Sequence, residues 1–170
     1  MEVVYSGVKI ISQTPPYQEL LLSKTINQPI VSISPNPSKY SSLIMYDPDS
    51  VKGIFIHWLV INIPINANNI SSGQIIKSYY KPSPPTKTGK HRYMFELYSH
   101  ANKLQLDTQK EINYNNVSKI LSGNPNAKLV KKLVFLSENK SQTGGKTYIS
   151  KRRSIRRKVY YKKTRRLYKY

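Results

Sequence analysis

Side chains that can carry chemistry gather in one stretch of the chain, between Asp47 and Tyr98. Asp47 and Asp49 flank a proline, and His57 and His91 each lie at the start of an apolar segment. Imidazole groups donate or accept hydrogen bonds near neutral pH, and carboxylates orient them or bind cations. These residue types suit general acid–base chemistry, a metal site or the binding of a small ion.

The same residues also have structural interpretations. A histidine that begins a buried strand is commonly a satisfied core residue, and Asp-Pro-Asp caps neighbouring backbone N–H groups well. A short metal-ligand spacing such as His-x-x-x-His is missing, which disfavours a metal ion, and we expect no cofactor. The chain has no cysteine and no Gly-x-Ser-x-Gly, and residues 144–147 lack the upstream glycine of a phosphate-binding loop. A hydrolase that uses His57, His91 and Asp47 remains an alternative.

Short strands must position these residues. The β-branched and aromatic run at 57–64 predicts a buried strand, and residues 42–46 predict a strand that ends at Asp47. The loop at 81–85 contains three prolines and cannot lie inside a sheet. Alternation across 92–97 predicts another strand, with one wetter face formed by Arg92, Met94 and Glu96.

The remaining segments fit a mainly β domain. Residues 3–5 and 8–11 flank Ser6-Gly7 and predict a hairpin. Residues 129–136 fit either a last strand or a helix, and we expect the strand. Asn116 begins a segment with helical spacing that ends at Gly123, which predicts a short helix. The length of 170 residues suits a single folded domain.

The order and spacing of these motifs resemble the phosphatidylethanolamine-binding protein family, which includes Raf kinase inhibitor proteins and plant flowering regulators. The resemblance covers residues 1–137 and is carried by Asp-Pro-Asp at 47–49, His-Trp-Leu-Val-Ile-Asn-Ile-Pro at 57–64, Ile-Ser-Ser-Gly at 70–73, Tyr79, and Thr-Gly-Lys-His-Arg-Tyr at 88–93. It implies a large antiparallel sheet packed with a smaller one and one short C-terminal helix.

The resemblance also implies a small cavity that takes an anion such as a phosphoryl head group. The ligand-binding residues carried over from the family are Asp47, Asp49, Phe55, His57, Pro84, Pro85, His91 and Tyr93. Imidazole and phenol groups donate hydrogen bonds to phosphoryl oxygens, and a carboxylate can hold a histidine in its donating tautomer. The family implies binding and not turnover. The alternative is a kinase or protease inhibitor with a vestigial pocket.

Several positions depart from the family pattern. No proline follows the turn at 47–50, the connection from Asp49 to His57 is short, and Lys81 and Ser83 stand where glycines are common. We expect these changes to alter the rim of the cavity.

Positive charge is concentrated at the C-terminal end. The chain has 28 basic and 8 acidic residues, a net charge of +20, and thirteen of the basic residues follow Glu138 without one acidic residue. The remaining 15 basic and 8 acidic residues give +7 for the preceding part. We expect a linker at 138–147 and a disordered tail at 148–170.

Lysine and arginine interleaved with tyrosine favour nucleic acid as the partner of this tail, with an anionic membrane second and an acidic protein third. The predicted polyanion-binding residues are Lys151, Arg152, Arg153, Arg156, Arg157, Lys158, Lys162, Lys163, Arg165 and Arg166.

The chain has no cysteine and no basic-then-apolar signal at its start. We expect an intracellular protein, cytoplasmic or nuclear, that is not secreted. The abundance of Lys, Asn, Ile and Tyr is typical of AT-rich genomes, so a virion protein of a large DNA virus is an alternative.

Overall fold

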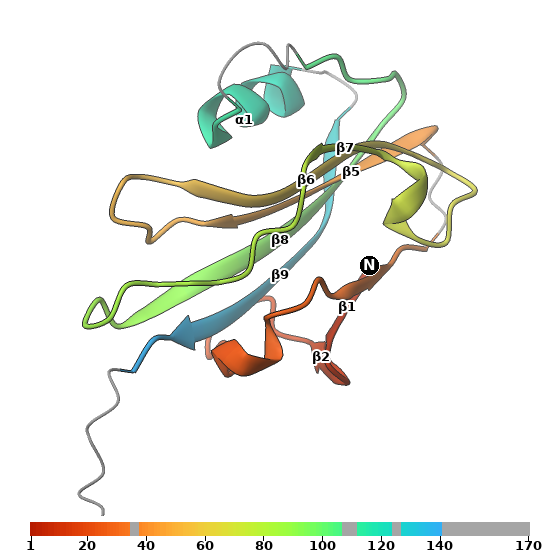
Figure 1. The fold of residues 1–170 in the computed structure, drawn as a ribbon. Coiled ribbons are helices and arrows are strands. Elements are labelled where there is room, and N and C mark those ends of the chain that lie inside the picture. Colours follow the sequence, from red (N-terminus) through yellow and green to blue (C-terminus); the bar gives the residue numbers. More distant parts are fainter. Residues whose placement is uncertain (35–37, 107–111, 124–126, 141–170) are drawn as a thin grey trace, which may run out of the picture.

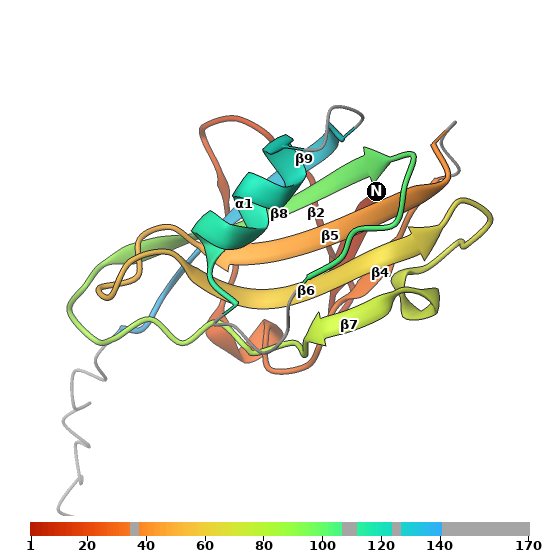
Figure 2. The ribbon, with the colours of Figure 1, turned by 90° about the horizontal axis from the view of Figure 1, so that it is seen from above.

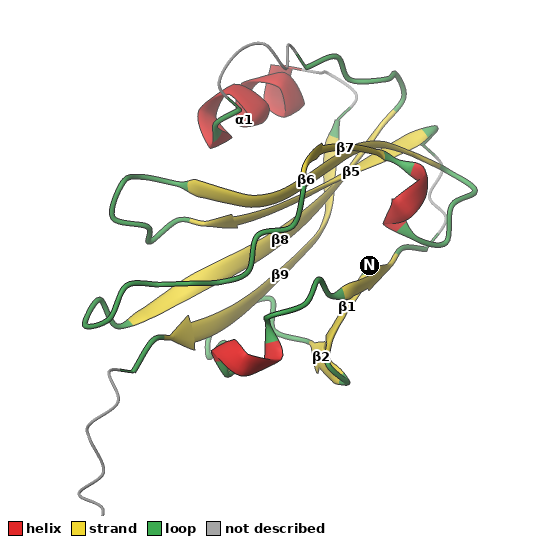
Figure 3. Cartoon of the chain, viewed as in Figure 1, coloured by secondary structure: helices red, strands yellow, loops and turns green. Residues whose placement is uncertain are grey.

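The computed structural model describes residues 1–34, 38–106, 112–123 and 127–140. Its elements form two β-sheets, one α-helix and two short 3-10 helices in this part of the chain (Figures 1 and 3). The small sheet has the order β2 (Val8–Ile10), β1 (Glu2–Tyr5) and β4 (Ile30–Ser32). The large sheet has the order β3 (Gln18–Glu19), β9 (Lys128–Glu138), β8 (Lys90–His100), β5 (Tyr40–Asp47), β6 (Phe55–Pro64) and β7 (Gln74–Lys77). The helices are η1 (Leu22–Lys24), η2 (Ile70–Ser72) and α1 (Tyr114–Gly123).

The large sheet is the middle of three layers. The small sheet covers one face of it and α1 covers the other (Figures 1 and 2). Every strand pair is antiparallel except β3–β9, which is parallel. The prediction of a large antiparallel sheet, a smaller sheet and a short helix is therefore confirmed.

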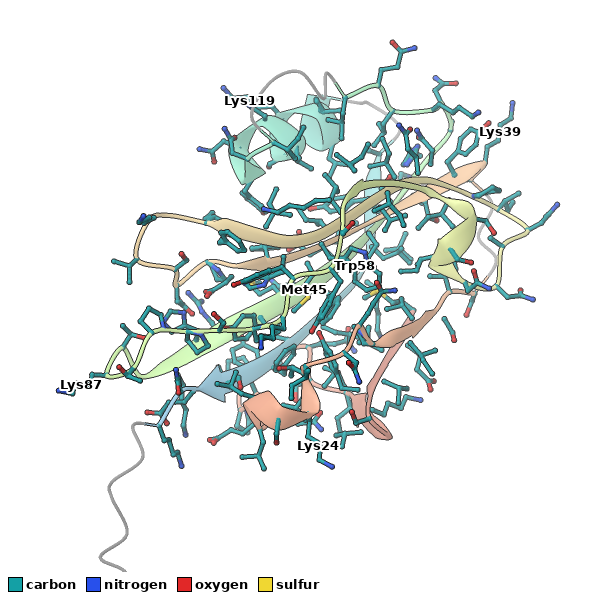
Figure 4. The ribbon with its side chains drawn as sticks, in the orientation of Figure 1. Lys24, Lys39, Met45, Trp58, Lys87 and Lys119 are labelled. Atoms are coloured by element: carbon teal, nitrogen blue, oxygen red, sulfur yellow. The ribbon has the colours of Figure 1, made fainter. Side chains whose placement is uncertain are left out.

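Period-two alternation divides the side chains of the large sheet between two cores. Met45 of β5 and Trp58 of β6 belong to the core beneath the small sheet, as Figure 4 shows. In β8, Phe95 points to that core and Met94 points to the core beneath α1. Burial of each such side chain stabilises the fold by about 1.5–3 kcal/mol.

We predicted that Arg92, Met94 and Glu96 form a more solvent-exposed face of β8, and this prediction is wrong for Met94 and Glu96. Arg92 is exposed, but Met94 is 7% and Glu96 only 5% exposed, because α1 packs over this face. The Glu96 carboxylate tolerates burial because it accepts hydrogen bonds from the hydroxyls of Tyr46 (2.9 Å) and Tyr98 (2.8 Å).

The hairpin and the helix form where the sequence predicts them. The strands β1 and β2 flank Ser6 (φ 44°) and Gly7 (φ 82°), which take the left-handed conformations that a two-residue hairpin turn requires. The helix begins slightly earlier than predicted, because Asn113 and not Asn116 caps it. The Asn113 side chain accepts a hydrogen bond from the Asn116 N–H (3.0 Å).

The chain leaves the domain through β9, which ends at Glu138. The predicted tail at 148–170 and most of the linker at 138–147 lie outside the described residues, so both remain predictions. Within the described part, no helix is long and apolar enough to cross a membrane.

Candidate functional site

Three strand ends meet at one end of the large sheet. β5 ends at Asp47, and its antiparallel neighbours β6 and β8 begin there, at Phe55 and Lys90. His57 and His91 follow within two residues of those starts. The pairing of the strands therefore brings together residues that lie more than 40 positions apart in the sequence.

A cavity of about 490 Å³ opens at this end of the sheet. Such a volume falls in the range of small-molecule sites. Seven of the eight predicted ligand-binding residues line it, namely Asp47, Phe55, His57, Pro84, Pro85, His91 and Tyr93. Ser83, where we expected a change at the rim, also lines the cavity. The other lining residues, which were not among the predicted ligand-binding residues, are Ser50, Val51, Lys52 and Tyr80.

Asp47 and His91 form a buried pair in the cavity wall. His91 Nδ1 lies 2.7 Å from Asp47 Oδ2, and the two side chains are 3% and 5% exposed. Asp47 Oδ1 accepts a hydrogen bond from the Asp49 N–H (2.8 Å). His91 Nε2 lies 2.8 Å from Thr88 Oγ1, which donates to the Pro85 carbonyl at 2.8 Å.

These contacts engage both ring nitrogens of His91 within the protein. One side of the ring contacts the Thr88 hydroxyl, and the other side contacts the Asp47 carboxylate, which can only accept when it is ionised. The Thr88–Pro85 contact and the Asp49 N–H hold these two partners in place.

A backbone carbonyl sets the tautomer of His57. Its Nδ1 lies 2.8 Å from the Tyr80 carbonyl oxygen, which only accepts, so Nδ1 carries a proton. Burial lowers the pKa of His57, and the Tyr80 carbonyl and the Asp47 charge oppose this shift. The neutral ring therefore has its lone pair on Nε2, and protonation turns that nitrogen into a donor.

The Tyr93 hydroxyl is an unsatisfied buried group at the cavity wall. Tyr93 is 0% exposed, and its Oη has no hydrogen-bond partner among the described residues. Burial is the main cause that raises the pKa of Tyr93, and the negative charge of Asp47 adds to it. The Ser83 N–H lies near the hydroxyl and lowers the pKa, but its geometry is not that of a hydrogen bond. The phenol is therefore protonated and keeps an unused donor.

Asp49 is the one predicted ligand-binding residue that does not line the cavity. Its carboxylate binds the Arg92 guanidinium through two hydrogen bonds (2.7 and 2.9 Å) and accepts the Arg92 backbone N–H (2.9 Å). The Arg92 side chain is the main cause that lowers the pKa of Asp49. The structure therefore gives Asp49 the role of joining the turn after β5 to the start of β8.

Aromatic rings line the mouth of the cavity, and a lysine lies over one of them. Phe55 contacts His57 edge-on (4.8 Å between ring centroids) and lies 5.9 Å from Tyr80. Lys77 Nζ lies 4.3 Å from the centroid of the Phe55 ring, which is a cation–π geometry. Tyr80 also donates its backbone N–H to the His57 carbonyl (2.8 Å), so the pairing of β6 continues past the end of β7.

A pattern in the sequence could have identified two of the missed residues. Tyr80 lies next to Tyr79 directly before the proline-rich loop, and Lys52 lies in the shortened connection before His57. In the described part of the chain, no group of three or more His, Asp or Glu residues has metal-binding geometry.

The family is decided by comparison with known proteins. The family model described as phosphatidylethanolamine-binding protein matches residues 18–134. The chain belongs to the phosphatidylethanolamine-binding protein family. The resemblance drawn from the motifs is thereby confirmed, and the two-sheet architecture is that of the family.

Solved structures have the same fold. A phosphatidylethanolamine-binding protein from Plasmodium vivax superposes with a TM-score of 0.60 at 18% identity, over 81% of this chain and 84% of that one. A carboxypeptidase Y inhibitor, solved in complex with its cognate proteinase, gives a TM-score of 0.60 at 22% identity, over 81% of this chain and 82% of that one.

Curated relatives share shorter regions. A 26 kDa secreted antigen of Toxocara canis is 38% identical over 85 residues, which are 46% of this chain and 32% of the antigen. A putative odorant-binding protein A5 of Drosophila melanogaster is 32% identical over 89 residues, which are 49% of this chain and 41% of the relative. The chain thus spans less than half the length of these two relatives.

The expectation of an intracellular protein that is not secreted is wrong in the light of these relatives, because one of them is a secreted antigen. The physical reason is that this fold buries its core without disulfides. A chain without cysteine folds in either redox environment, so cysteine content does not assign a compartment.

Proposed function

We propose that the protein is a non-enzymatic binding protein whose cavity takes a small phosphoryl anion, such as the phosphate of a lipid head group. The Tyr93 hydroxyl, buried at the cavity wall without a partner, carries this proposal. Leaving such a group unsatisfied costs about 1–3 kcal/mol. Its oxygen lies near the Ser83 N–H, and its proton is unused, so the ligand it suits is a hydrogen-bond acceptor.

The charges around the cavity favour an anion. Asp47 is paired with His91 and Asp49 with Arg92, so neither carboxylate lies near the cavity without a partner. Lys52 is exposed at the mouth, where it adds a positive charge. Among the residues that line the cavity, Tyr93 keeps a hydroxyl without a partner and His57 keeps an Nε2 whose proton depends on pH.

His57 couples binding to a proton. Burial lowers its pKa, so at neutral pH its Nε2 is an acceptor that cannot bind a phosphodiester. A bound anion favours the imidazolium and raises this pKa. Affinity is therefore highest below the pKa of free His57, falls between the free and bound pKa values, and is constant above both.

The hydrolase alternative finds little support in this geometry. Both nitrogens of His91 already have partners, and in the described part of the chain no hydrogen bond joins a cavity serine to His57 or His91. A nucleophile needs an adjacent base to activate it. The arrangement fits reversible binding better than covalent chemistry.

A second candidate is inhibition of a protease or kinase. The observation that favours it is the shared fold with a carboxypeptidase Y inhibitor that forms a complex with its proteinase. In this candidate a surface binds the enzyme and the cavity is vestigial. Substitution of His57 would then leave inhibition unchanged.

The basic C-terminal segment adds a polyanion-binding arm to the proposal. Residues 141–170 contain twelve Lys and Arg residues and no Asp or Glu. Such a segment neutralises phosphates of a nucleic acid or of acidic lipids. Its ten basic residues from Lys151 to Arg166 carry this role in the proposal.

Calorimetric titration of the full chain with glycerophosphoethanolamine, a soluble phosphodiester, tests the cavity. A hydrogen bond to a charged group contributes about 1.5–3 kcal/mol, so His57→Gln should weaken binding by roughly tenfold or more. The matched control is His100→Gln, because His100 is also buried but lies at the other end of β8, where it contacts Ser42 and Asn102. Equal affinity in wild type and His57→Gln would contradict the proposal.

A further inference from the structure

Exposed apolar side chains line the mouth of the cavity and the chain next to it. Val51 is 75% exposed, Tyr80 is 51% exposed, and Ile54 and Phe55 are each 38% exposed. Val51, Phe55 and Tyr80 line the cavity itself, and Ile54 precedes Phe55 in the β5–β6 connection. Single exposed apolar residues are ordinary, but several around one opening indicate an interaction surface.

The same surface carries unneutralised positive charge. Lys52 lines the mouth, Lys77 lies over the Phe55 ring, and the exposed Lys81 follows Tyr80. The nearby carboxylates are both paired, Asp47 with His91 and Asp49 with Arg92. No ion pair joins these three lysines to an acidic residue in the described part of the chain.

The basic segment leaves the domain at this same end. In the register of the sheet, Ser137 pairs with His91 and Glu138 pairs with Lys90. The β5–β6 connection, the loop before β8 and the end of β9 all lie at one end of the molecule (Figures 1 and 2), and Figure 4 shows Lys87 at the tip of that loop. β9 therefore ends at the same end of the large sheet as the cavity and not at the far end.

We propose that this end of the molecule docks on an anionic membrane surface through a docking face formed by Val51, Lys52, Ile54, Phe55 and Tyr80. The apolar side chains enter the boundary between head groups and acyl chains, and the lysines contact acidic head groups. The cavity then opens toward the lipid. The identity of the ligand in the cavity depends on the function proposed above. The docking face does not, because it is argued from the exposed residues around the cavity mouth.

The aliphatic residues decide between a membrane and a nucleic acid. Bases stack on aromatic rings and phosphates pair with basic groups, so neither interaction uses Val51 or Ile54. Insertion at a bilayer surface uses both, since it removes apolar area from water. Tyr80 and Phe55 also suit the head-group level, where aromatic rings concentrate. A basic segment alone favours nucleic acid, and the docking face shifts the balance to a membrane.

The absence of cysteine from the chain allows a site-specific test on the full-length protein. Val51→Cys and Leu129→Cys are each labelled with an environment-sensitive fluorophore and mixed with phosphatidylcholine vesicles, with or without phosphatidylserine. Leu129 is the matched control because it is 50% exposed and pairs with Tyr98, at the opposite end of β8 from His91.

The proposal predicts that the label at position 51 brightens on vesicles with phosphatidylserine and is quenched by nitroxide-bearing acyl chains, while the label at 129 does neither. It also predicts that Val51→Ser weakens vesicle binding about tenfold and Lys52→Gln about fivefold, the latter only on anionic vesicles. Leu129→Ser should leave vesicle binding unchanged.

Three results would overturn the docking face. They are vesicle binding without a response at position 51, equal responses at 51 and 129, and a response at 51 to duplex DNA but not to vesicles. Titration with glycerophosphoethanolamine in the absence of vesicles separates the two proposals. Binding of that compound without docking leaves the cavity function intact, and docking without its binding leaves the docking face intact.

Discussion

Replacement of Tyr93 by phenylalanine should raise stability and lower ligand affinity at the same time. The substitution removes one oxygen and keeps the ring, which stacks on Phe135 with centroids 5.2 Å apart and packs edge-on against His57. The packing of the core is therefore unchanged. Only the buried hydroxyl, which has no hydrogen-bond partner among the described residues, is lost.

The magnitude follows from what that hydroxyl does in each state. In the unfolded chain it is hydrated, whereas in the fold it is buried without a partner, at a cost of about 1–3 kcal/mol. Tyr93→Phe should raise the free energy of unfolding by about that amount, which for a chain of this size is about 2–4 °C in melting temperature per kcal/mol. Loss of a donor to a charged ligand should weaken phosphodiester binding by about 10- to 150-fold.

The assay pairs denaturant unfolding with calorimetric titration of glycerophosphoethanolamine. Tyr46→Phe is the matched control, because Tyr46 is also buried in the large sheet but donates its hydroxyl to Glu96 at 2.9 Å. This control should lose about 1.5–3 kcal/mol of stability and keep its affinity, since the hydrogen bond that it breaks lies beneath α1. A Tyr93→Phe protein that is destabilised, or that binds as well as wild type, would refute the reasoning.

Further predictions concern protonation, the turn after β5, a close packing contact and the basic tail. Phosphodiester affinity should increase as pH falls from 8 to 5 in wild type and stay flat in His57→Gln; an identical profile in both would exclude His57 as the linked group. Asp49→Asn should cost about 1 kcal/mol of stability at pH 7, a loss that disappears in acid as Asp49 of wild type protonates at its lowered pKa. Gly73→Ala should cost about 1–3 kcal/mol, because a Cβ there would lie 2.6 Å from Ile63 Cγ1, whereas Gly123→Ala meets nothing within 4 Å and should be neutral or stabilising. Any affinity for duplex DNA should fall about 10³- to 10⁵-fold between 50 and 200 mM salt, and deletion of residues 141–170 should abolish it; a flat salt response would exclude the tail as a polyanion-binding arm.

Much of the fold was readable from local patterns. The β-branched run of β6 and the alternation in β8 predict strands because their side-chain period matches a pleated sheet. The resemblance to the family, carried over position by position, named seven residues that line the cavity.

Tertiary contacts explain what the sequence concealed. We predicted Asp49 as a ligand-binding residue because it belongs to the Asp-Pro-Asp turn. In the structure its carboxylate accepts two hydrogen bonds from the guanidinium of Arg92 in β8. The sequence pattern predicts that Glu96 faces solvent, but α1 covers it. The hydroxyls of Tyr46 and Tyr98 donate hydrogen bonds to its carboxylate. The tautomer of His57 depends on the Tyr80 backbone carbonyl, which no residue type encodes.

The most direct measurement of the central claim is nitrogen NMR of the histidine rings, titrated with glycerophosphoethanolamine at pH 7. The chain has three histidines, so each ring can be assigned by substitution. The account predicts that free His57 carries its proton on Nδ1 and a lone pair on Nε2. Binding of the ligand should raise the pKa of His57, so that Nε2 takes up a proton from solvent, while the shifts of His100 stay constant. A His57 ring that remains neutral and unshifted at saturating ligand would contradict the claim that this cavity binds a phosphoryl anion.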